Sequence, residues 1–390
     1  MKITKISLYK IKGANLMDKH SPVPSFFLDG FYIIKIFTNQ GILGFGEPSP
    51  YAAPEKNVIS SFLLETFKSL IGIDPINVPV KLTAPQNLPS IDKAAFKALN
   101  AGIMQAIWDI RGKFINLPIY KMLDSSSSGQ GKVYASGGMW YEDRDPITLV
   151  EEALKSKEEG FFGYKFRPSI PRNSGDHFSR NLNPPFVNIE QTKLLAKTLR
   201  NSLGDDFDLM LDFGCRLNFN QAQDLCYFLD GLDFKFIEEP LVRSAELYKT
   251  LCAFSNLKIA GGETAYDFET FMNWNNFDAL DIFQPDSNLC SIDDIKKLDQ
   301  KLSTSGSIVM HNWVSDISCT SNFHVGVSLR SCDLIEYSIL FNPFRETIVN
   351  GTPRPQKGWI TCSNNPGLGL CIDETSLEAK SEFIISLCHN

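Results

Sequence analysis

Six polar residues recur in the second half of the chain at nearly constant intervals. They are separated by 26, 25, 23, 25 and 25 residues, and each lies at or near the end of a short apolar run: Asp212, Glu238, Glu263, Asp286, His311 and Glu336. A repeat of about 25 residues, with one strand and one helix in each unit, is typical of a (β/α)8 barrel. Because all strands of such a barrel end at one face, we expect these side chains to gather there.

Three of these residues are acids on successive strands, Asp212, Glu238 and Glu263. Carboxylates that crowd together raise one another's pKa unless a cation holds them. Oxygen ligands without Cys or His favour Mg²⁺ over Zn²⁺. The sequence therefore predicts that the three acids bind Mg²⁺, and the alternative is that they are solvated acids at strand ends. In the stretch "FIEEP" we assign Glu238 as the ligand, and we expect Glu239 to point away or to support the site indirectly.

Two cations, Lys165 and Arg167, lie two residues apart in the run "GYKFR". Side chains with this spacing share one side of a strand. Arg167 stays protonated, so we expect its charge to lower the pKa of Lys165 and make that amine a usable base. The alternative is a pair of surface cations.

His311 and Asp286 end neighbouring predicted strands. An acid beside a histidine fixes its tautomer and stabilises its charged form, as a general base or acid requires. The remaining histidines have no such partner and are expected to be structural or loop residues: His20, His177, His324 and His389.

The elements that must position these residues follow Lys132. Eight apolar runs alternate with segments long enough for helices: "VYASGGM", "GYKFR", "DLMLDFG", "FKFIEEP", "KIAGGE", "LDIFQPD", "SIVMHNW" and "DLIEYS". An open doubly wound sheet is the competing fold, but it needs a glycine-rich phosphate loop, which we do not find. The step from Lys165 to Asp212 is long, at 47 residues, and predicts an inserted loop over the catalytic face at 168–188.

The chain before the barrel has a mixed pattern. "FYIIKIFTNQGILGFGEPSP" predicts two strands joined at Asn39-Gln40-Gly41, and two stretches with helical periodicity follow, the second of which ends near Pro118. "DSSSSGQGK" (124–132) is typical of a flexible connector. We therefore expect an α+β domain at 1–128, the barrel at 129–355, and a C-terminal segment at 356–390 that returns to the first domain.

Composition restricts the possible partners. The net charge of −7 and the pI near 5.4 argue against nucleic acids and anionic membranes. No apolar run reaches the roughly 18 residues of a membrane span, and the start of the chain lacks a signal-peptide apolar block. The nine Cys residues include no CxxC pair, so we expect reduced thiols in the cytoplasm.

Taken together, these motifs resemble the mandelate racemase subgroup of the enolase superfamily. The similarity lies in "LMLDFG", "FIEEP" and "AGGET" for metal binding, "YKFR" for the base Lys165, "QPD" with "MHNW" for the Asp286–His311 dyad, and "IEY" for Glu336. The resemblance implies that the first domain caps the barrel, that Glu336 hydrogen-bonds the substrate, and that the protein is a symmetric homo-oligomer. Three positions depart from the family pattern: Gly214 stands where Asn is common, no Gly-Gly follows Asp286, and Arg167 replaces Lys.

This resemblance implies a Mg²⁺-dependent enzyme that removes the proton α to a carboxylate and forms a metal-stabilised enediolate. Because the inserted loop is polar and suits a polyol, we expect a dehydratase of an acid sugar, an aldonate or aldarate, that gives a 2-keto-3-deoxy acid. The alternatives are a racemase or epimerase, a Schiff-base lyase using Lys165, and a non-catalytic metabolite-binding barrel. We expect specificity to lie in residues 15–30 and in the inserted loop.

Overall fold

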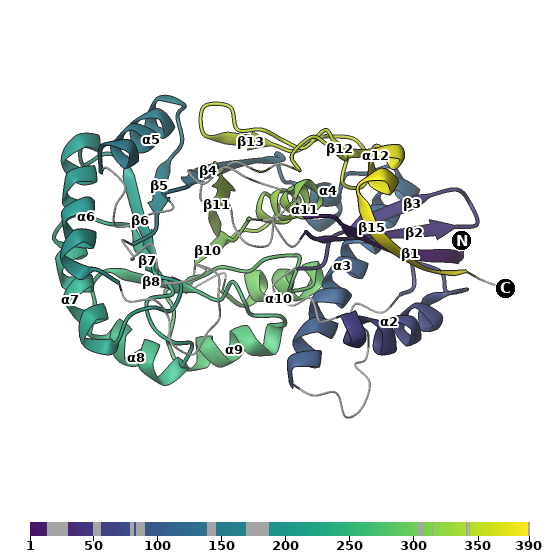
Figure 1. Cartoon of the computed structure of the whole chain (residues 1–390), viewed down its shortest axis with the longest axis horizontal. Helices are drawn as coiled ribbons and strands as arrows, with labels where there is room; N and C mark the ends of the chain where they lie inside the picture. Colours follow the sequence, from purple (N-terminus) through teal and green to yellow (C-terminus); the bar gives the residue numbers. More distant parts are fainter. Residues whose placement is uncertain are drawn as a thin grey trace.

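The first and last strands of the chain lie side by side in one small domain. In the computed structural model, β1 (Ile3–Ile11) pairs antiparallel with β15 (Ser381–Cys388). Figure 1 shows this domain on the right, with both termini at its edge, and the barrel on the left. The structure describes residues 1–13, 30–49, 56–78, 82, 90–138, 146–168, 187–302, 307–313, 315–340, 342 and 344–388.

The small domain, called the cap here, is a four-stranded sheet covered by helices. The sheet has the order β15-β1-β2-β3, in which β2 (Tyr32–Thr38) and β3 (Leu43–Gly46) form the hairpin that the sequence predicts. The helices are α2 (Lys56–Leu70), α3 (Ser90–Ile115) and the short α4 (Ile119–Leu123). Because β1 alternates, Ile6 and Leu8 face one apolar cluster, which α2 and α3 complete.

The opposite face of the cap sheet packs against the barrel. Tyr9 and Ile11 of β1 join an apolar cluster with Trp313 and Ile317, which follow the carboxyl end of a barrel strand. Both faces of the cap sheet are therefore buried, and the cap is fixed over the ends of the barrel strands.

Eight parallel strands close into the barrel that the sequence predicts, because the first and last of them also pair. In chain order they are β4 (Gln130–Ser136), β5 (Gly163–Phe166), β6 (Asp208–Asp212), β7 (Phe236–Glu238), β8 (Lys258–Gly261), β9 (Ile282–Phe283), β10 (Ser307–Met310) and β11 (Cys332–Ser338). Side chains from different strands fill the interior and form a floor under the site: Tyr134, Met210, Phe236, Ala260, Ile282, Val309 and Leu334.

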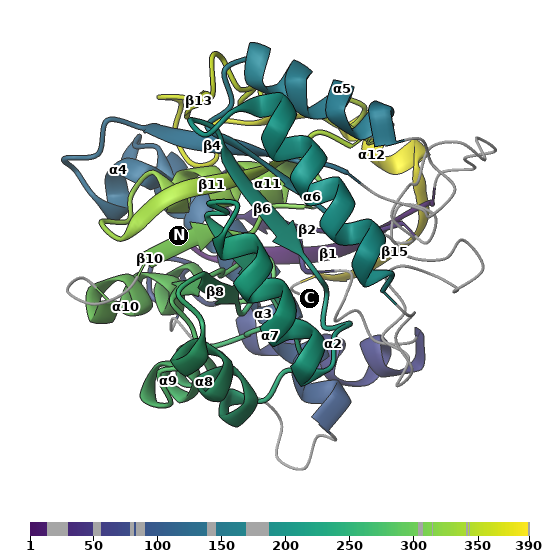
Figure 2. The ribbon, with the colours of Figure 1, turned by 90° about the vertical axis from the view of Figure 1, so that its left-hand side faces the viewer.

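Helices surround these strands, and Figure 2 looks onto α5, α6 and α7. In chain order they are α5 (Pro146–Glu158), α6 (Ile189–Leu203), α7 (Phe219–Asp230), α8 (Ala245–Phe254), α9 (Phe268–Asn276), α10 (Ile292–Leu302) and α11 (Asp316–Gly326). After β11 the described residues form no eighth barrel helix. They continue through β12 (Val349–Asn350), β13 (Trp359–Thr361), β14 (Cys371–Ile372) and α12 (Glu374–Ala379) to β15.

The connector at 124–132 is more ordered than the sequence suggests. Ser127 donates its hydroxyl to the carbonyl of Val327 at 2.6 Å, and β4 already begins at Gln130. Its small residues serve close packing, because a side chain at Gly129 would collide with the ring of Tyr120. The expectation of a flexible connector is therefore wrong. Among the described residues, no helix is both long and apolar enough to cross a membrane.

Candidate active site

The three acids predicted to bind a metal lie together at the mouth of the barrel. Asp212 and Glu238 are the last residues of β6 and β7 and are register partners, and Glu263 follows β8 by two residues. One carboxylate oxygen from each of the three acids lies within 4.8 Å of the others. This arrangement could hold one cation.

The chemistry of the cluster fits a divalent cation. Oε1 of Glu238 is buried and accepts no hydrogen bond from any described residue. The carboxylates here outnumber the permanent cations in contact with them among the described residues. Three cations, Lys165, Arg167 and Arg243, contact five acids: Asp212, Glu238, Glu239, Glu263 and Glu336. Two positive charges would balance this excess, and all the donor atoms are hard oxygens.

Asp212 is oriented by the backbone that follows it. The amide of Gly214 donates to Oδ1 of Asp212 at 2.8 Å. Gly214 has φ +51°, and a Cβ there would lie 2.3 Å from the guanidinium of Arg216. Gly214, which stands where Asn is common in the family, thus orients Asp212 through its backbone amide.

Lys165 is buried among the acids. Its Nζ lies 2.6 Å from Glu238 Oε2 and 2.8 Å from Glu336 Oε1. Burial favours the neutral amine, but these two carboxylates outweigh burial and raise the pKa of Lys165 well above its ordinary value. Arg167 does lower this pKa, as expected, but by less. The expectation of a lowered Lys165 pKa is therefore wrong.

Arg167 lies on the same side of β5 as Lys165, as the spacing predicts. Its guanidinium forms an ion pair with Oδ2 of Asp212 and lies 4.9 Å from the ring centre of Trp313. Arg167 therefore links the first acid to a tryptophan that packs against the cap.

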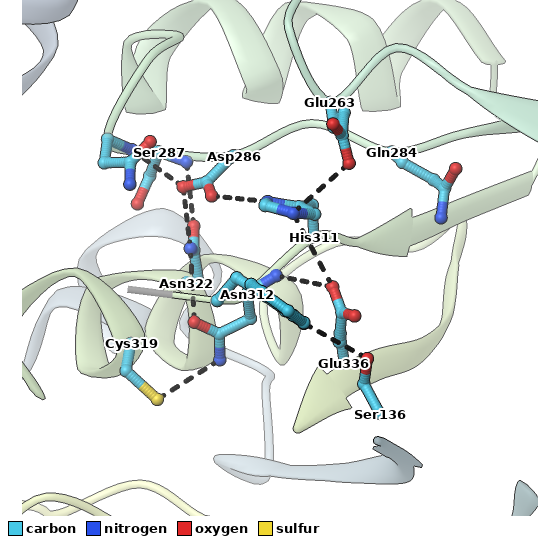
Figure 3. A network of polar contacts seen from close by, with 12 residues as sticks. Ser136, Glu263, Gln284, Asp286, Ser287, His311, Asn312, Cys319, Asn322 and Glu336 are labelled. Carbon is cyan, nitrogen blue, oxygen red and sulfur yellow. Dashed lines mark hydrogen bonds and ion pairs between the residues drawn. The ribbon is translucent and has the colours of Figure 1, made fainter. Parts of the chain in front are cut away.

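His311 and Asp286 form the predicted pair, and Figure 3 shows the histidine between acids on two sides. Nδ1 of His311 lies 2.7 Å from Asp286 Oδ2, and Nε2 lies 3.4 Å from Glu263 Oε2. Burial lowers the pKa of His311, but Glu263 and Asp286 outweigh burial and raise the pKa to about 10. The imidazole is thus held as a charged proton donor in this geometry.

Glu336 lies between the two proton carriers. Its Oε2 accepts a hydrogen bond from the Asn312 amide at 3.0 Å and lies 3.9 Å from Nε2 of His311. Burial raises the pKa of Glu336, but Lys165 and His311 outweigh burial and lower the pKa to about 2. An ionised Glu336 only accepts hydrogen bonds, so it must take up a proton before it can donate one to an anionic substrate.

Several supporting residues were missed by the sequence reasoning. Gln284 donates to Glu238 Oε2 at 2.7 Å, and Asn322 of α11 donates to Asp286 Oδ1 at 2.8 Å. Gln284 could have been found, because it lies two residues before Asp286 on an extended segment. The sequence contains no comparable indication for Asn322, because this residue lies in the helix α11 and not near the end of a strand.

A buried acid also joins the cap to the barrel. Glu47, just after β3, accepts hydrogen bonds from the amides of Ser315 and Ser318 at 3.1 and 3.0 Å and from the Ser315 hydroxyl at 2.5 Å. Burial raises the pKa of Glu47 to about 7, although these donors oppose the shift. We call Glu47 with Ser315 and Ser318 the joint.

Some expectations fall outside the described residues. These are most of the inserted loop at 168–188, the specificity region at 15–30 except Gly30, and three histidines: His20, His177 and His389. The remaining histidine, His324, is buried and structural, because it receives the Tyr120 amide at 3.3 Å and contacts the Leu368 carbonyl.

Comparisons with known proteins agree with this architecture. Residues 25–124 match the N-terminal domain of mandelate racemase and muconate lactonizing enzyme, and residues 148–376 match the enolase C-terminal domain-like family. The chain is similar to D-gluconate/D-galactonate dehydratase of Picrophilus torridus, with 25% identity over 96% of this chain and 93% of that protein. It is 27% identical to D-galactonate dehydratase of Variovorax paradoxus over the same shares of the two chains.

A solved structure resembles the whole chain as well. The 3,6-anhydro-D-galactonate cycloisomerase of Zobellia galactanivorans superposes with a TM-score of 0.79 and 25% identity, over 98% of this chain and all of that one.

Proposed function

Since the chain belongs to the mandelate racemase and muconate lactonizing enzyme family of the enolase superfamily, we propose that it is a Mg²⁺-dependent dehydratase of an acid sugar, an aldonate or aldarate. The curated relatives described above are named as dehydratases of gluconate and galactonate, which supports this substrate class. The product of the reaction is a 2-keto-3-deoxy acid.

One observation supports the proposal most strongly. An amine and an imidazole, Lys165 and His311, both lie near Glu336, beside the three acids that could bind a metal. Lys165 and His311 lie 2.8 and 3.9 Å from the two oxygens of Glu336. Proton removal and proton donation can therefore take place around one small molecule. A role in binding alone would not require two buried, oppositely placed proton carriers.

Asp212, Glu238 and Glu263 would hold the metal ion, which when bound acts as a Lewis acid on the substrate carboxylate. Lys165 or His311 takes the proton from the α-carbon, depending on the configuration there. The C–H electron pair moves into the carbon framework, and the negative charge that develops on the carboxylate is hydrogen-bonded by Glu336 in its protonated form. The other carrier then protonates the β-hydroxyl, which leaves as water as the electron pair forms a double bond between the α- and β-carbons. The resulting enol becomes the keto acid when its hydroxyl loses a proton and the β-carbon gains one.

The protonation states must change before this chemistry can start. Lys165 is charged because Glu238 and Glu336 raise its pKa. If Glu238 held a divalent cation, its negative charge would act less on Lys165, and Lys165 would lose its proton more readily. The negative charge of a substrate carboxylate beside Glu336 raises the pKa of Glu336 and so favours its protonated form.

A screen of aldonic and aldaric acids tests the proposal. The protein is incubated with each acid and Mg²⁺, and 2-keto products are detected with semicarbazide, with an EDTA-treated sample as the control. We expect a keto product from at least one acid, and only with the metal. Absence of product from all acids would contradict the dehydratase assignment.

Racemisation or epimerisation of a 2-hydroxy acid is the second candidate. It is favoured by the same pair of carriers, because a substrate without a β-leaving group can lose a proton to one and regain it from the other. In deuterium oxide this reaction places deuterium at the α-carbon without a keto product, so the two functions give different results in the same screen.

A further inference from the structure

The second acid of "FIEEP", Glu239, is buried but does not join the three acids of the metal cluster. Its carboxylate faces Arg243, which lies just before α8. Nε of Arg243 donates to Oε1 of Glu239 at 2.8 Å, and an amino group of the same guanidinium pairs with Oε2. This two-point contact fixes the plane of the guanidinium as well as its position.

The backbone at Glu239 is specialised for this contact. The residue has φ +41°, a value uncommon for residues that carry a Cβ. Its carbonyl accepts the amide of Cys215 at 2.6 Å, and the Cys215 thiol lies 3.4 Å from Oε2. The β6–β7 end of the barrel thus holds Glu239 in a conformation that turns its side chain toward Arg243.

The same guanidinium also reaches the third acid. Arg243 lies 3.5 Å from Oε1 of Glu263, while His311 lies 3.4 Å from the other oxygen. Asp212 and Glu238 have partners at 2.6 to 2.8 Å, and their side chains are at most 2% exposed. The side chain of Glu263 is 23% exposed, and the contacts that it makes with charged side chains of the described residues are the two long ones to Arg243 and His311.

We propose that Arg243 is a positioning residue that holds Glu263 toward the metal site, and that Glu239 keeps Arg243 in place. This inference rests on the proposed function, in which the three acids bind a divalent cation. In this arrangement Glu239 pairs with the guanidinium and prevents it from closing directly on Glu263. Arg243 can then orient the third acid without occupying the place of the metal.

The test compares Arg243→Met with Lys249→Met. Lys249 lies on α8, is exposed, and loses the same charge when replaced, so it controls for net charge. Mg²⁺ affinity is measured by calorimetry, and Mn²⁺ affinity by electron paramagnetic resonance. We expect about 10-fold weaker metal binding for Arg243→Met and wild-type binding for Lys249→Met. With excess Mg²⁺, the kcat of Arg243→Met should return toward wild type, because the chemistry itself does not use Arg243.

Glu239→Gln provides a second measurement, since it frees the guanidinium to pair with Glu263. It should also weaken metal binding, and the double variant with Arg243→Met should be no weaker than Arg243→Met alone. Unchanged or tighter metal binding in Arg243→Met overturns the inference. Additive losses in a double variant with a wild-type circular dichroism spectrum also overturn it, since the two residues would then act separately. If the wild-type protein itself binds no divalent cation, the proposed function fails instead.

Discussion

Two buried glutamates in this molecule have opposite electrostatic surroundings. Glu336 at the centre of the barrel has a pKa lowered to about 2, and Glu47 at the joint has a pKa raised to about 7. Both side chains are fully buried. Burial raises both pKa values, and the difference lies in the partners. Lys165 and His311 bring positive charge to Glu336. Among the described residues, Glu47 accepts hydrogen bonds from the Ser315 hydroxyl and two backbone amides, and the nearby Asp316 carboxylate raises its pKa further.

The comparison shows where this protein concentrates charge. At the mouth of the barrel, the cations Lys165 and His311 hold the buried Glu336 in its ionised form. At the joint, Glu47 of the cap accepts hydrogen bonds from Ser315 and Ser318 of the barrel, and its charge depends on pH. Four changes break or sharpen this contrast.

Removal of Lys165 should have the largest effect. Lys165→Met eliminates a proton carrier and leaves Glu238 and Glu336 buried without their cation, so we expect kcat to fall by about 10⁴-fold. Steady-state assays on the acid that reacts in the screen measure this loss. In EDTA, the melting temperature of Lys165→Met should be lower than that of the wild type, and Mg²⁺ should restore part of the difference. Activity within tenfold of the wild type would mean that another residue serves as the carrier.

His311→Asn should reduce kcat by about 10³-fold, because asparagine cannot carry a proton. Calorimetric Mg²⁺ titration should show nearly unchanged affinity, since His311 is not among the proposed ligands. If metal binding collapsed, the contact between His311 and Glu263 would be the more important role of the histidine.

At the joint, the expected effect is on stability. The folded-state pKa of Glu47 is raised from 4.5 to about 7, so folding favours its protonated form. The stabilisation of the folded state by protonated Glu47 is complete below pH 4.5 and is lost as pH rises through 7. The loss amounts to roughly 3 kcal/mol of unfolding free energy. We expect the wild type to lose roughly 3 kcal/mol of unfolding free energy relative to Glu47→Gln when the pH rises from 4.5 to 8. Urea unfolding at several pH values measures it, and a constant difference would refute the assignment.

The smallest change sharpens the same point. Ser315→Ala removes the hydroxyl that donates to Glu47, so it should cost about 2 kcal/mol of unfolding free energy at pH 8, where the acid is charged, and about 1 kcal/mol at pH 5. Ser376→Ala, at an exposed hydroxyl that bonds Asp373 in the cap, is the matched control. An equal cost for Ser315→Ala at both pH values would show that the charge of Glu47 does not change in this range.

The barrel and the grouping of its polar ends could be predicted because they depend on local repeats. Asp212, Glu238 and His311 each end a short buried run, and parallel strands in a closed barrel bring such ends to one face. The prediction for the Lys165 pKa failed for a different reason. It considered the nearest neighbour in sequence, Arg167. In the fold, Glu238 of β7 lies 2.6 Å from the lysine amine, and closure of the sheet between β11 and β4 brings Glu336 to 2.8 Å.

The joint could not be predicted at all. Glu47 and Ser315 are separated by 268 positions in the sequence, and no periodicity connects a hairpin in the cap with the start of α11. The flexible connector was misjudged because Ser and Gly can serve close packing as well as chain mobility. Composition alone does not distinguish these two uses.

The pairing of β15 with β1 has a consequence for synthesis on the ribosome. β1 has one neighbour, β2, within 40 residues, but its other edge stays open until residues 381–388 are made. A nascent chain therefore carries an unpaired strand edge through most of translation, which exposes it to association with other chains. We expect chains cut before residue 381 to aggregate even though the whole barrel is present.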